Sequence, residues 1–140
     1  MTVVQSPLGT CFGPYTTAAE IAQGVDLSGK TAIVTGGASN IGRETVRVLA
    51  ATGADVIVPA RDANAARLAL STLSNVEVAP MDLLDPSSIE GFAANFIKNG
   101  RPLDLLVLSA GVMATPLFRD AQGQEGQFAT NHLGHFRFTG

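Results

Sequence analysis

A glycine-rich turn between a predicted strand and a predicted helix constrains this fold more than any other feature of the sequence. Residues 31–35 (TAIVT) form a short, β-rich apolar run, and residues 36–42 (GGASNIG) follow it directly. The residues after this turn have helical periodicity, and the helix that they predict is expected to end at Gly53. The predicted apolar face of this helix consists of Ile41, Thr45, Val48, Leu49 and Thr52. A strand, a tight turn and a helix in this order predict the first unit of an α/β fold.

The rest of the chain alternates strands with helices. Apolar runs predict three further strands, at 55–59, 76–79 and 103–108. Helical patterns fall between and after them, at 62–73, 85–100 and from about 124 to the end. The helix at 85–100 is expected to bury Ile89, Phe92, Phe96 and Ile97. Because parallel neighbours need crossover connections, this alternation predicts a parallel sheet covered by helices on both faces.

Composition and charge limit the classes of partner. The chain has 140 residues, enough for one domain, and 9 basic against 12 acidic residues give a net charge of −3. Without a basic surplus, nucleic-acid binding is disfavoured. The longest near-continuous apolar stretch, 105–114, is about half of the roughly 20 residues that a membrane span needs. Cys11 is the single cysteine, which fits a reducing compartment, so we expect a cytoplasmic protein with no membrane partner.

The two ends of the chain differ in character. Residues 1–15 contain several glycines and prolines without periodicity and are predicted to form a flexible N-terminal arm. Residues 16–140 form the predicted folded domain. It opens with a capping box, Thr17 to Glu20, which predicts a short helix over 17–23 that ends at Gly24.

The glycine-rich turn is suited to a phosphate group. Backbone N–H groups at a helix N-terminus attract negative charge, and glycines let a pyrophosphate approach the backbone. The turn lacks the Gly-Lys-Ser/Thr ending of a P-loop, so nucleoside triphosphate hydrolysis is not supported. The alternative is that these glycines serve only tight packing of the helix on the strand.

Arg61 follows the second predicted strand, where an NAD site commonly has an acidic residue. A guanidinium group can hold a 2′-phosphate through two hydrogen bonds, which favours NADP(H) over NAD(H). The same arginine argues against an S-adenosylmethionine methyltransferase, a third hypothesis. Two alternatives stay open: Arg61 is a solvated surface charge, or the adjacent Asp62 weakens the preference for NADP.

These residues resemble the short-chain dehydrogenase/reductase family. The family's Thr-Gly-x-x-x-Gly-x-Gly is matched at 35–42, with Asn40 in place of the middle glycine, and asparagine tolerates a positive φ. Residues 81–83 (MDL), 108–111 (LSAG) and 127–136 (QFATNHLGHF) resemble three further family segments. The opening segment 16–30 and the segments 60–62, 111–116 and 131–136 are similar to retinol-dehydrogenase-like members.

The resemblance implies a Rossmann-type three-layer α/β/α domain that binds NADP. It implies hydride transfer between the nicotinamide and a small carbonyl or alcohol substrate, with Asn131 helping to position a water in the proton relay. The implied cofactor-binding residues are Gly36, Ala38, Ser39, Asn40, Ile41, Gly42, Arg61, Asp82, Leu83, Ser109, Ala110 and Gly111. No metal site is implied. His132 and His135 lack nearby partners for a metal site and are expected to have structural or interface roles.

The sequence also departs from the family's pattern. Ser109 stands where the family has an asparagine that bonds across neighbouring strands, so weaker support of the sheet is expected. The family's catalytic Ser and Tyr-x-x-x-Lys would follow Asn131, but the sequence ends at Gly140, and Tyr15 has Ala19 four residues on. We therefore expect an N-terminal half that is inactive alone, with a sheet of about four strands in the order 3-2-1-4 and the fourth strand as an open edge.

The expected partners follow from the same resemblance. The helix with Asn131 often lies in a subunit interface in the family, so Phe136 and Phe138 are expected to pack against a second copy or a missing C-terminal half. The alternative function is a non-catalytic nucleotide-binding or interaction module, a truncated or decayed relative.

Overall fold

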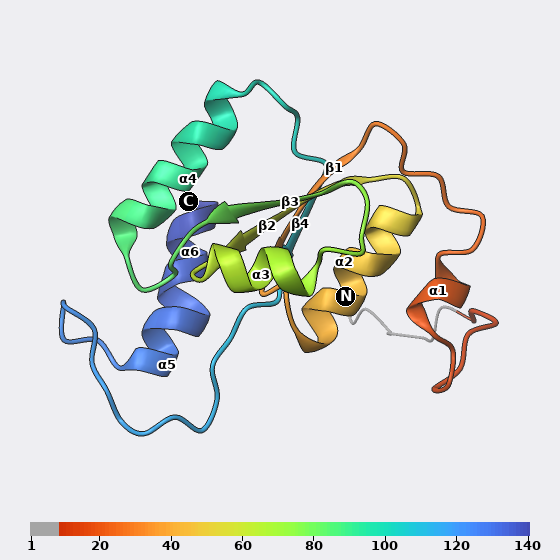
Figure 1. The fold of residues 1–140 in the computed structure, drawn as a ribbon. Coiled ribbons are helices and arrows are strands. Elements are labelled where there is room, and N and C mark those ends of the chain that lie inside the picture. The colour runs from red at the N-terminus through yellow and green to blue at the C-terminus, as the bar shows by residue number, and fades with distance from the viewer. Residues whose placement is uncertain (1–8) are drawn as a thin grey trace, which may run out of the picture.

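A computed structural model describes residues 9–140 of the chain (Figure 1). Residues 1–8, the greater part of the predicted N-terminal arm, lie outside the described residues. The strands are β1 (Thr31–Thr35), β2 (Asp55–Ala60), β3 (Val76–Pro80) and β4 (Leu105–Leu108). The helices are α1 (Ala18–Ile21), α2 (Asn40–Ala51), α3 (Ala63–Ala69), α4 (Pro86–Lys98), α5 (Gly126–Phe128), the π-helical turn η1 (Ala129–Leu133) and α6 (Gly134–Thr139).

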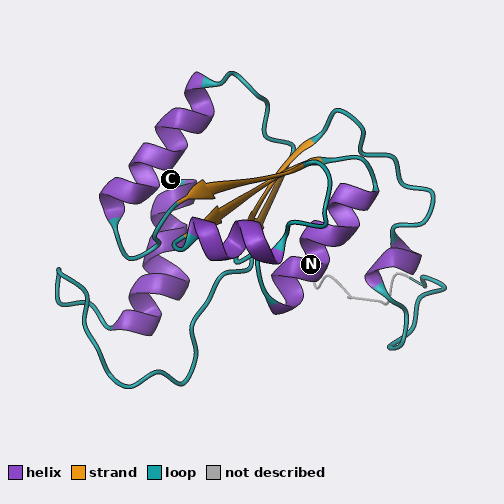
Figure 2. Ribbon diagram, viewed as in Figure 1, coloured by secondary structure: helices purple, strands orange, loops and turns teal. Residues whose placement is uncertain are grey.

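The four strands form one parallel sheet in the order β3-β2-β1-β4, as predicted. Helices cover both faces of this sheet (Figure 2). The central strand β1 is buried along its whole length, because it has a strand on each side and a helical layer on each face. The three-layer α/β/α architecture is therefore confirmed.

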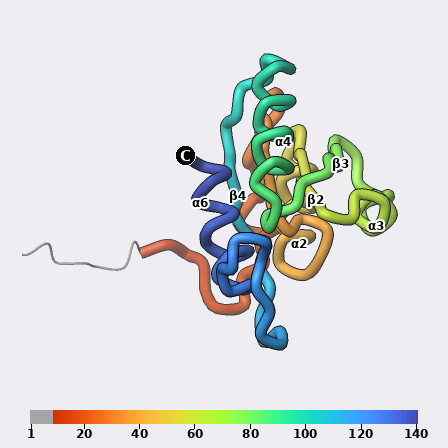
Figure 3. The backbone as a smooth tube through the Cα atoms, turned by 90° about the vertical axis from the view of Figure 1, so that its left-hand side faces the viewer, coloured from red at the N-terminus to blue at the C-terminus, as the bar shows by residue number. Residues whose placement is uncertain are grey.

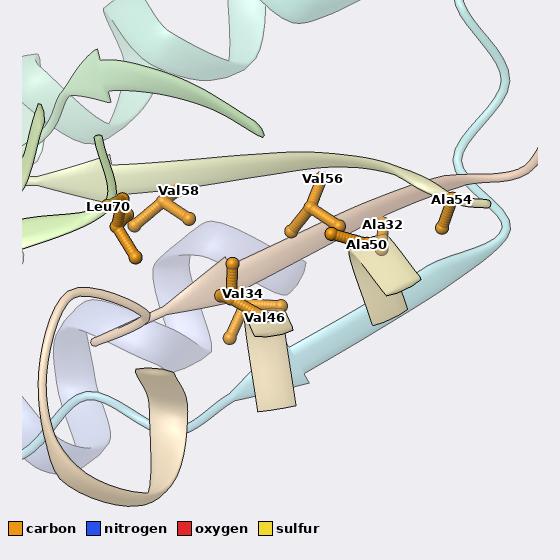
Figure 4. Close-up of a cluster of buried hydrophobic side chains, with 8 residues drawn as sticks. All are labelled: Ala32, Val34, Val46, Ala50, Ala54, Val56, Val58 and Leu70. Atoms are coloured by element: carbon orange, nitrogen blue, oxygen red, sulfur yellow. The ribbon is translucent and has the colours of Figure 1, made fainter. Parts of the chain in front are cut away.

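Alternate residues of the strands point to opposite faces of the sheet and contribute to two separate hydrophobic cores. One core lies between the sheet and α2, and Figure 4 shows Val34, Val56 and Val58 facing Val46 and Ala50 of that helix. The residues in between point to the opposite face. The first core consists of Ala32, Val34, Val46, Ala50, Ala54, Val56, Val58 and Leu70.

The second core lies beneath α4 and α6. Ile33 and Ile57 of the sheet pack there with Met81, Ile89 and Phe92. The two helices run side by side (Figure 3), and the ring of Phe138 meets that of Phe92 edge to face at 5.6 Å between centroids. Phe138 therefore contributes to the packing of this second core and is partly buried within the chain.

The predicted face of the first core helix is wrong in part. Leu49 packs against the first core, but the buried residues of α2 are Gly42, Val46 and Ala50, and Ile41 is 80% exposed. Gly42 sets this rotation, because a side chain there would overlap the Gly36 carbonyl oxygen and only glycine allows this close approach. Residues at intervals of four from Gly42 then face the sheet.

The predicted buried face of α4 contains a smaller error of the same kind. Ile89 and Phe92 of α4 are buried and Phe96 is partly buried, as predicted, but Ile97 is 75% exposed. At about 100° per residue, Ile97 lies roughly 80° or more around the helix from the other three. Its hydrophobic side chain therefore points away from the core.

Local signals at the helix ends hold well. The capping box of α1 is formed by Thr17 and Glu20, and Asp62 and Asp85 cap α3 and α4 with their side chains. The predicted helices at 62–73 and 124–140 differ in extent: α3 is shorter, and the last helix contains the π turn η1. Within residues 9–140, no helix has the length and apolar character needed to cross a membrane.

The outer side of β4 has no partner strand among the residues that the structure describes. Leu106 and Leu108 of this strand are 37% and 42% exposed. This confirms the predicted open edge within residues 9–140. All four strands point their carboxyl ends in the same direction, so the loops that follow them gather at one end of the sheet (Figure 1).

Candidate functional site

A crevice of about 600 Å³ lies at the carboxyl ends of the four strands. This is where ligands bind in open parallel sheets. All twelve predicted cofactor-binding residues line it: Gly36, Ala38, Ser39, Asn40, Ile41, Gly42, Arg61, Asp82, Leu83, Ser109, Ala110 and Gly111. Segments up to 75 residues apart in the sequence thus meet around one space. Asn131 is not among the lining residues, but its side chain stands directly behind Gly111.

The glycine-rich turn forms the floor of this crevice and depends on close backbone contacts. Gly36 has a φ of +68°, and a Cβ there would lie 2.7 Å from the Cα of Ala110. Asn40 has a φ of +46°, so it adopts the conformation that its predicted role requires. The N-cap residue Ser39 makes no side-chain bond to the helix. The first N–H groups of α2 therefore lack a side-chain cap and suit an anion.

Arg61 lies at the rim of the crevice, directly after β2. It is exposed and forms no ion pair within residues 9–140. The neighbouring carboxylate of Asp62 is committed elsewhere: its Oδ1 accepts a hydrogen bond of 2.9 Å from the backbone of Ala65 at the start of α3. Both residues line the crevice, and the guanidinium of Arg61 is the one of these two charged groups that has no hydrogen-bond partner within residues 9–140.

The loop after β3 is fixed by short-range hydrogen bonds. The backbone N–H of Asp82 donates to the Ser88 hydroxyl at 2.9 Å, and the Asp82 carboxylate accepts from the N–H of Leu84 at 2.9 Å. A side chain at Gly134 would overlap the carbonyl oxygen of Leu83. The last helix therefore packs tightly against the loop that carries Asp82 and Leu83.

Asn131 holds the loop after β4 in a two-point clasp. Its Oδ1 accepts from the Val112 N–H at 2.8 Å, and its Nδ2 donates to the Val112 carbonyl at 2.8 Å. Nearby, Gln127 accepts from the Ala114 N–H at 3.1 Å. Both polar atoms of the Asn131 side chain are thus engaged with the backbone, and a side chain at Gly111 would crowd its Oδ1 at 3.3 Å.

Thr35 joins the ends of β1 and β4. Its buried hydroxyl accepts from the N–H of Ser109 at 3.0 Å and from the N–H of Ala110 at 3.1 Å. This link between neighbouring strands uses the backbone at position 109, so it does not depend on the length of the Ser109 side chain. Sequence reasoning used Thr35 only as part of a motif. Its place at the end of the central strand was the signal that could have revealed this role.

Glu125 begins the helical segment that carries Asn131. Its carboxylate accepts from the N–H groups of Gln127 at 2.9 Å and Phe128 at 2.7 Å. These two hydrogen bonds favour the charged form and hold the pKa of Glu125 below its ordinary value, with a smaller contribution from Arg119. These hydrogen bonds thus cap the first turn of the helical segment that carries Asn131.

The two histidines of this helix face different surroundings. His132 is exposed and stacks between the rings of Phe128 and Phe136, whereas His135 is buried and bonds to Thr35 and to the Asn131 backbone. Within residues 9–140 there is no group of three or more His, Cys, Asp or Glu side chains placed to hold a metal ion.

Comparison with known proteins reveals extensive similarity. The sequence model of the short chain dehydrogenase family matches residues 30–140. The Brassica napus protein "Short-chain dehydrogenase TIC 32 B, chloroplastic" is 38% identical over 134 residues, which cover 91% of this chain and 42% of the relative. Retinol dehydrogenase 11 of Mus musculus is 42% identical over 121 residues, which cover 82% of this chain and 38% of the relative.

Solved structures give the same result. The Pseudomonas aeruginosa RhlG/NADP active-site complex matches with a TM-score of 0.66 and 29% identity, over 81% of this chain and 46% of that chain. The chain spans about two fifths of the length of the curated relatives it matches. Because the family match extends from the residue before β1 through α6, the chain belongs to the short-chain dehydrogenase family.

Proposed function

We propose that this chain is the NADP(H)-binding part of an oxidoreductase that transfers hydride between the nicotinamide and a small carbonyl or alcohol substrate. The observation that carries the proposal is the single crevice in which the glycine-rich turn, Arg61, Asp82 and the 109–111 loop all meet. Family membership supports a nicotinamide cofactor, and the RhlG complex shows that one structural relative holds NADP.

The crevice fits a dinucleotide phosphate group on two counts. The turn is tightly folded, because a Cβ at Gly36 would collide with the backbone of Ala110 and one at Gly42 with the Gly36 carbonyl oxygen. The N-terminus of α2 opens into the crevice without a side-chain cap. We propose that the pyrophosphate lies against residues 36–42, with the adenosine near Asp82 and Leu83 and the nicotinamide toward Ser109, Ala110 and Gly111.

The preference for NADP over NAD is supported by the different engagement of Arg61 and Asp62. Arg61 is exposed at the rim, while Asp62 caps α3. The helix N–H occupies one oxygen of the Asp62 carboxylate, whereas the free guanidinium of Arg61 can take up a 2′-phosphate. We therefore propose that Asp62 does not cancel the preference that Arg61 creates.

The proton that accompanies hydride transfer needs a general acid or base. The nicotinamide supplies or accepts the hydride when bound. The sole tyrosine of the chain, Tyr15, is 95% exposed and precedes β1, outside the crevice. We propose that this chain binds the cofactor and that Asn131 fixes the loop beside it, without turnover on its own. A non-catalytic nucleotide-binding module is the second candidate, because it needs the same crevice and no general acid.

Fluorescence titration with NADPH and NADH tests the proposal. We expect tighter binding of NADPH, and Arg61→Ala should weaken it about tenfold or more while leaving NADH unchanged, since a hydrogen bond to a charged group contributes about 1.5–3 kcal/mol. Arg67→Ala is the matched control, because within residues 9–140 that exposed arginine bonds only to Asn64 and the Val78 carbonyl. Equal affinities would point to NAD, and binding of S-adenosylmethionine alone would point to a methyltransferase.

Turnover separates the two candidates for the complete protein. Consumption of NADPH with any member of a panel of aldehydes and ketones would support the oxidoreductase. Tight NADPH binding without turnover in any longer form of the protein would support the non-catalytic module.

We also propose a reducing compartment such as the cytoplasm, because one cysteine cannot form an internal disulfide.

A homo-oligomer remains part of the proposal. The outer face of the last helix carries Phe128, His132 and Phe136 in a stacked row, and Phe136 is 70% exposed. An exposed aromatic row of this kind supports association through this face. Sedimentation of the wild type and of Phe136→Glu would test it: a dimer that the substitution dissociates agrees with the proposal, and a wild-type monomer contradicts it.

A further inference from the structure

His135 is a buried titratable residue that the proposed chemistry leaves without a role. Its side chain belongs to α6 and is 7% exposed. Both ring nitrogens have partners: Nε2 lies 2.9 Å from the Thr35 hydroxyl oxygen, and Nδ1 lies 3.0 Å from the Asn131 backbone oxygen. The ring therefore bridges the end of the central strand and the residue that clasps the loop after β4.

The hydrogen-bond partners of Thr35 determine where the protons of this bridge lie. A hydroxyl oxygen has two lone pairs and one hydrogen. The N–H groups of Ser109 and Ala110 occupy both lone pairs, so the Thr35 hydrogen is the one group left to bond with His135. Nε2 must then accept this hydrogen and carry none of its own.

The other side of the ring leads independently to the same assignment. The Asn131 carbonyl oxygen can only accept a hydrogen bond, so the Nδ1 atom facing it must carry the proton. A neutral imidazole protonated on Nδ1 alone satisfies both ends. The chain of donors then runs from the 109–110 backbone through Thr35 and His135 to Asn131, and hydrogen bonds aligned in this way polarise one another.

We propose that His135, in its Nδ1–H form, is a positioning residue that fixes Asn131 and the 109–110 backbone relative to the end of β1. The tautomer follows from the bonds alone. The functional consequence of this positioning rests on the proposed function. In that function, Ser109 and Ala110 border the nicotinamide, and Asn131 holds the neighbouring Val112. His135 itself does not line the crevice, so it acts through its neighbours rather than on a substrate.

A space-filling role for this ring makes a different prediction. Thr35 is 1% exposed, so a phenyl ring at position 135 would leave its hydroxyl hydrogen buried without that partner. Two polar variants each keep one hydrogen bond of the bridge and remove the other. In His135→Gln, the side-chain oxygen can reach the place of Nε2 and accept from Thr35. In His135→Asn, the shorter amide can reach Asn131 but not Thr35.

Nitrogen NMR of the imidazole rings tests the tautomer directly. The chain has two histidines, so His132→Gln leaves His135 as the single imidazole, and His135→Gln supplies the matching spectrum of exposed His132. At about pH 8 we expect the His135 ring to show one proton, on Nδ1, because its two hydrogen-bond partners require this form. A proton on Nε2, or an exchanging mixture like that of a free imidazole, would overturn the assignment.

Hydrogen exchange of the Ser109, Ala110 and Val112 amides tests the positioning role. We expect roughly tenfold faster exchange at 109 and 110 in His135→Asn and His135→Phe but near wild-type exchange there in His135→Gln. His135→Gln should instead speed exchange at Val112, because it loses the link to Asn131. Uniform acceleration at all amides, or no difference between the Gln and Phe variants, would show a role in packing alone.

These tests do not depend on the cofactor. If the wild type fails to bind NADPH but His135 has the Nδ1–H form and the exchange pattern above, the proposed function fails and the bridge stands. If NADPH binds and the ring carries its proton on Nε2, the bridge fails and the function stands. Should a position-135 variant not fold, the His132→Gln spectrum still decides the tautomer, because His132 lies on the exposed face of the helix.

Discussion

The two sides of the crevice are built by different means. The turn at 36–42 is held by backbone atoms in close contact, with no side-chain cap on the helix after it. The loop at 109–125 is held by side chains: Thr35, Asn131 and Gln127 each bond to one of its backbone groups. Packing against glycine tolerates no added atom, whereas a loop fixed by side-chain bonds loses its supports one at a time. The two sides should therefore respond to mutation in different ways.

The largest effect is expected from Gly42→Ala. The added Cβ would overlap the Gly36 carbonyl oxygen, so the turn and α2 must move apart, at a cost of about 3 kcal/mol or more in the free energy of unfolding. Chemical denaturation measures this loss. Gly91→Ala is the control, since a Cβ at that position of α4 meets nothing within 4 Å and alanine should stabilise the helix by about 1 kcal/mol. Equal destabilisation by both would refute the packing argument.

A smaller effect is expected from Asn131→Ala. The variant removes both bonds of the clasp on Val112, which should lower the free energy of unfolding by about 2 kcal/mol. Amide exchange at Val112 should accelerate by more than the loss in the free energy of unfolding explains. Exchange in β1 and β2 should accelerate only as far as that loss predicts. Gln127→Ala, which removes the single bond to Ala114, should cost about half as much. A larger loss from Gln127→Ala would contradict the assignment of the clasp to Asn131.

The far end of the sheet has a side-chain clasp of its own that titrates. Asp104 pairs with Lys30 at 2.8 Å and accepts from the Thr31 N–H at 2.9 Å. The bond from Lys30, then that from Thr31, lowers the pKa of Asp104 below its ordinary value. A depressed carboxyl pKa means that the unfolded chain takes up the proton first, so the clasp stabilises the fold above about pH 4 and its contribution disappears as the pH falls further.

Asp104→Asn should therefore reduce stability at pH 7 by less than Asn131→Ala does, because Lys30, its partner in the ion pair, is about half exposed to solvent. The difference between this variant and the wild type should shrink as denaturation is repeated from pH 7 down to about pH 3, below the ordinary aspartate pKa. A difference that stays constant over this range would mean that the charge of Asp104 contributes nothing.

The smallest effect is expected from Ile41→Ser, on the glycine side of the crevice. Ile41 is 80% exposed, so the free energy of unfolding should change by less than about 0.5 kcal/mol. Val46→Ala, one turn further along the same helix, removes a fully buried side chain and should cost more than about 1 kcal/mol. Thermal unfolding of the pair tests the observed rotation of α2, and the reverse order would support the face predicted from the sequence.

The same contrast explains how much could be predicted from the sequence. The strands, their order and the residues around the crevice follow from apolar runs and from a motif whose glycines are needed locally. The rotation of α2 was missed because hydropathy favours Ile41, while the contact between Gly42 and the Gly36 carbonyl decides it. The bridge from Thr35 to His135 joins residues 100 positions apart, and no local pattern marks such a pair.

The π turn at Ala129–Leu133 limits how the length of this gene segment can change over time. Here the Gly134 N–H reaches back five residues to the Ala129 carbonyl instead of four. Because five residues here cover about the rotation that four make in an α-helix, deleting one codon within the turn would restore ordinary spacing with α6 nearly in place, whereas inserting one would rotate α6 by about 100° around its axis. After such an insertion, His135 would leave Thr35 and Phe138 would leave Phe92 in a single step. Insertions should therefore collect in the exposed 113–124 loop and be purged from 129–133.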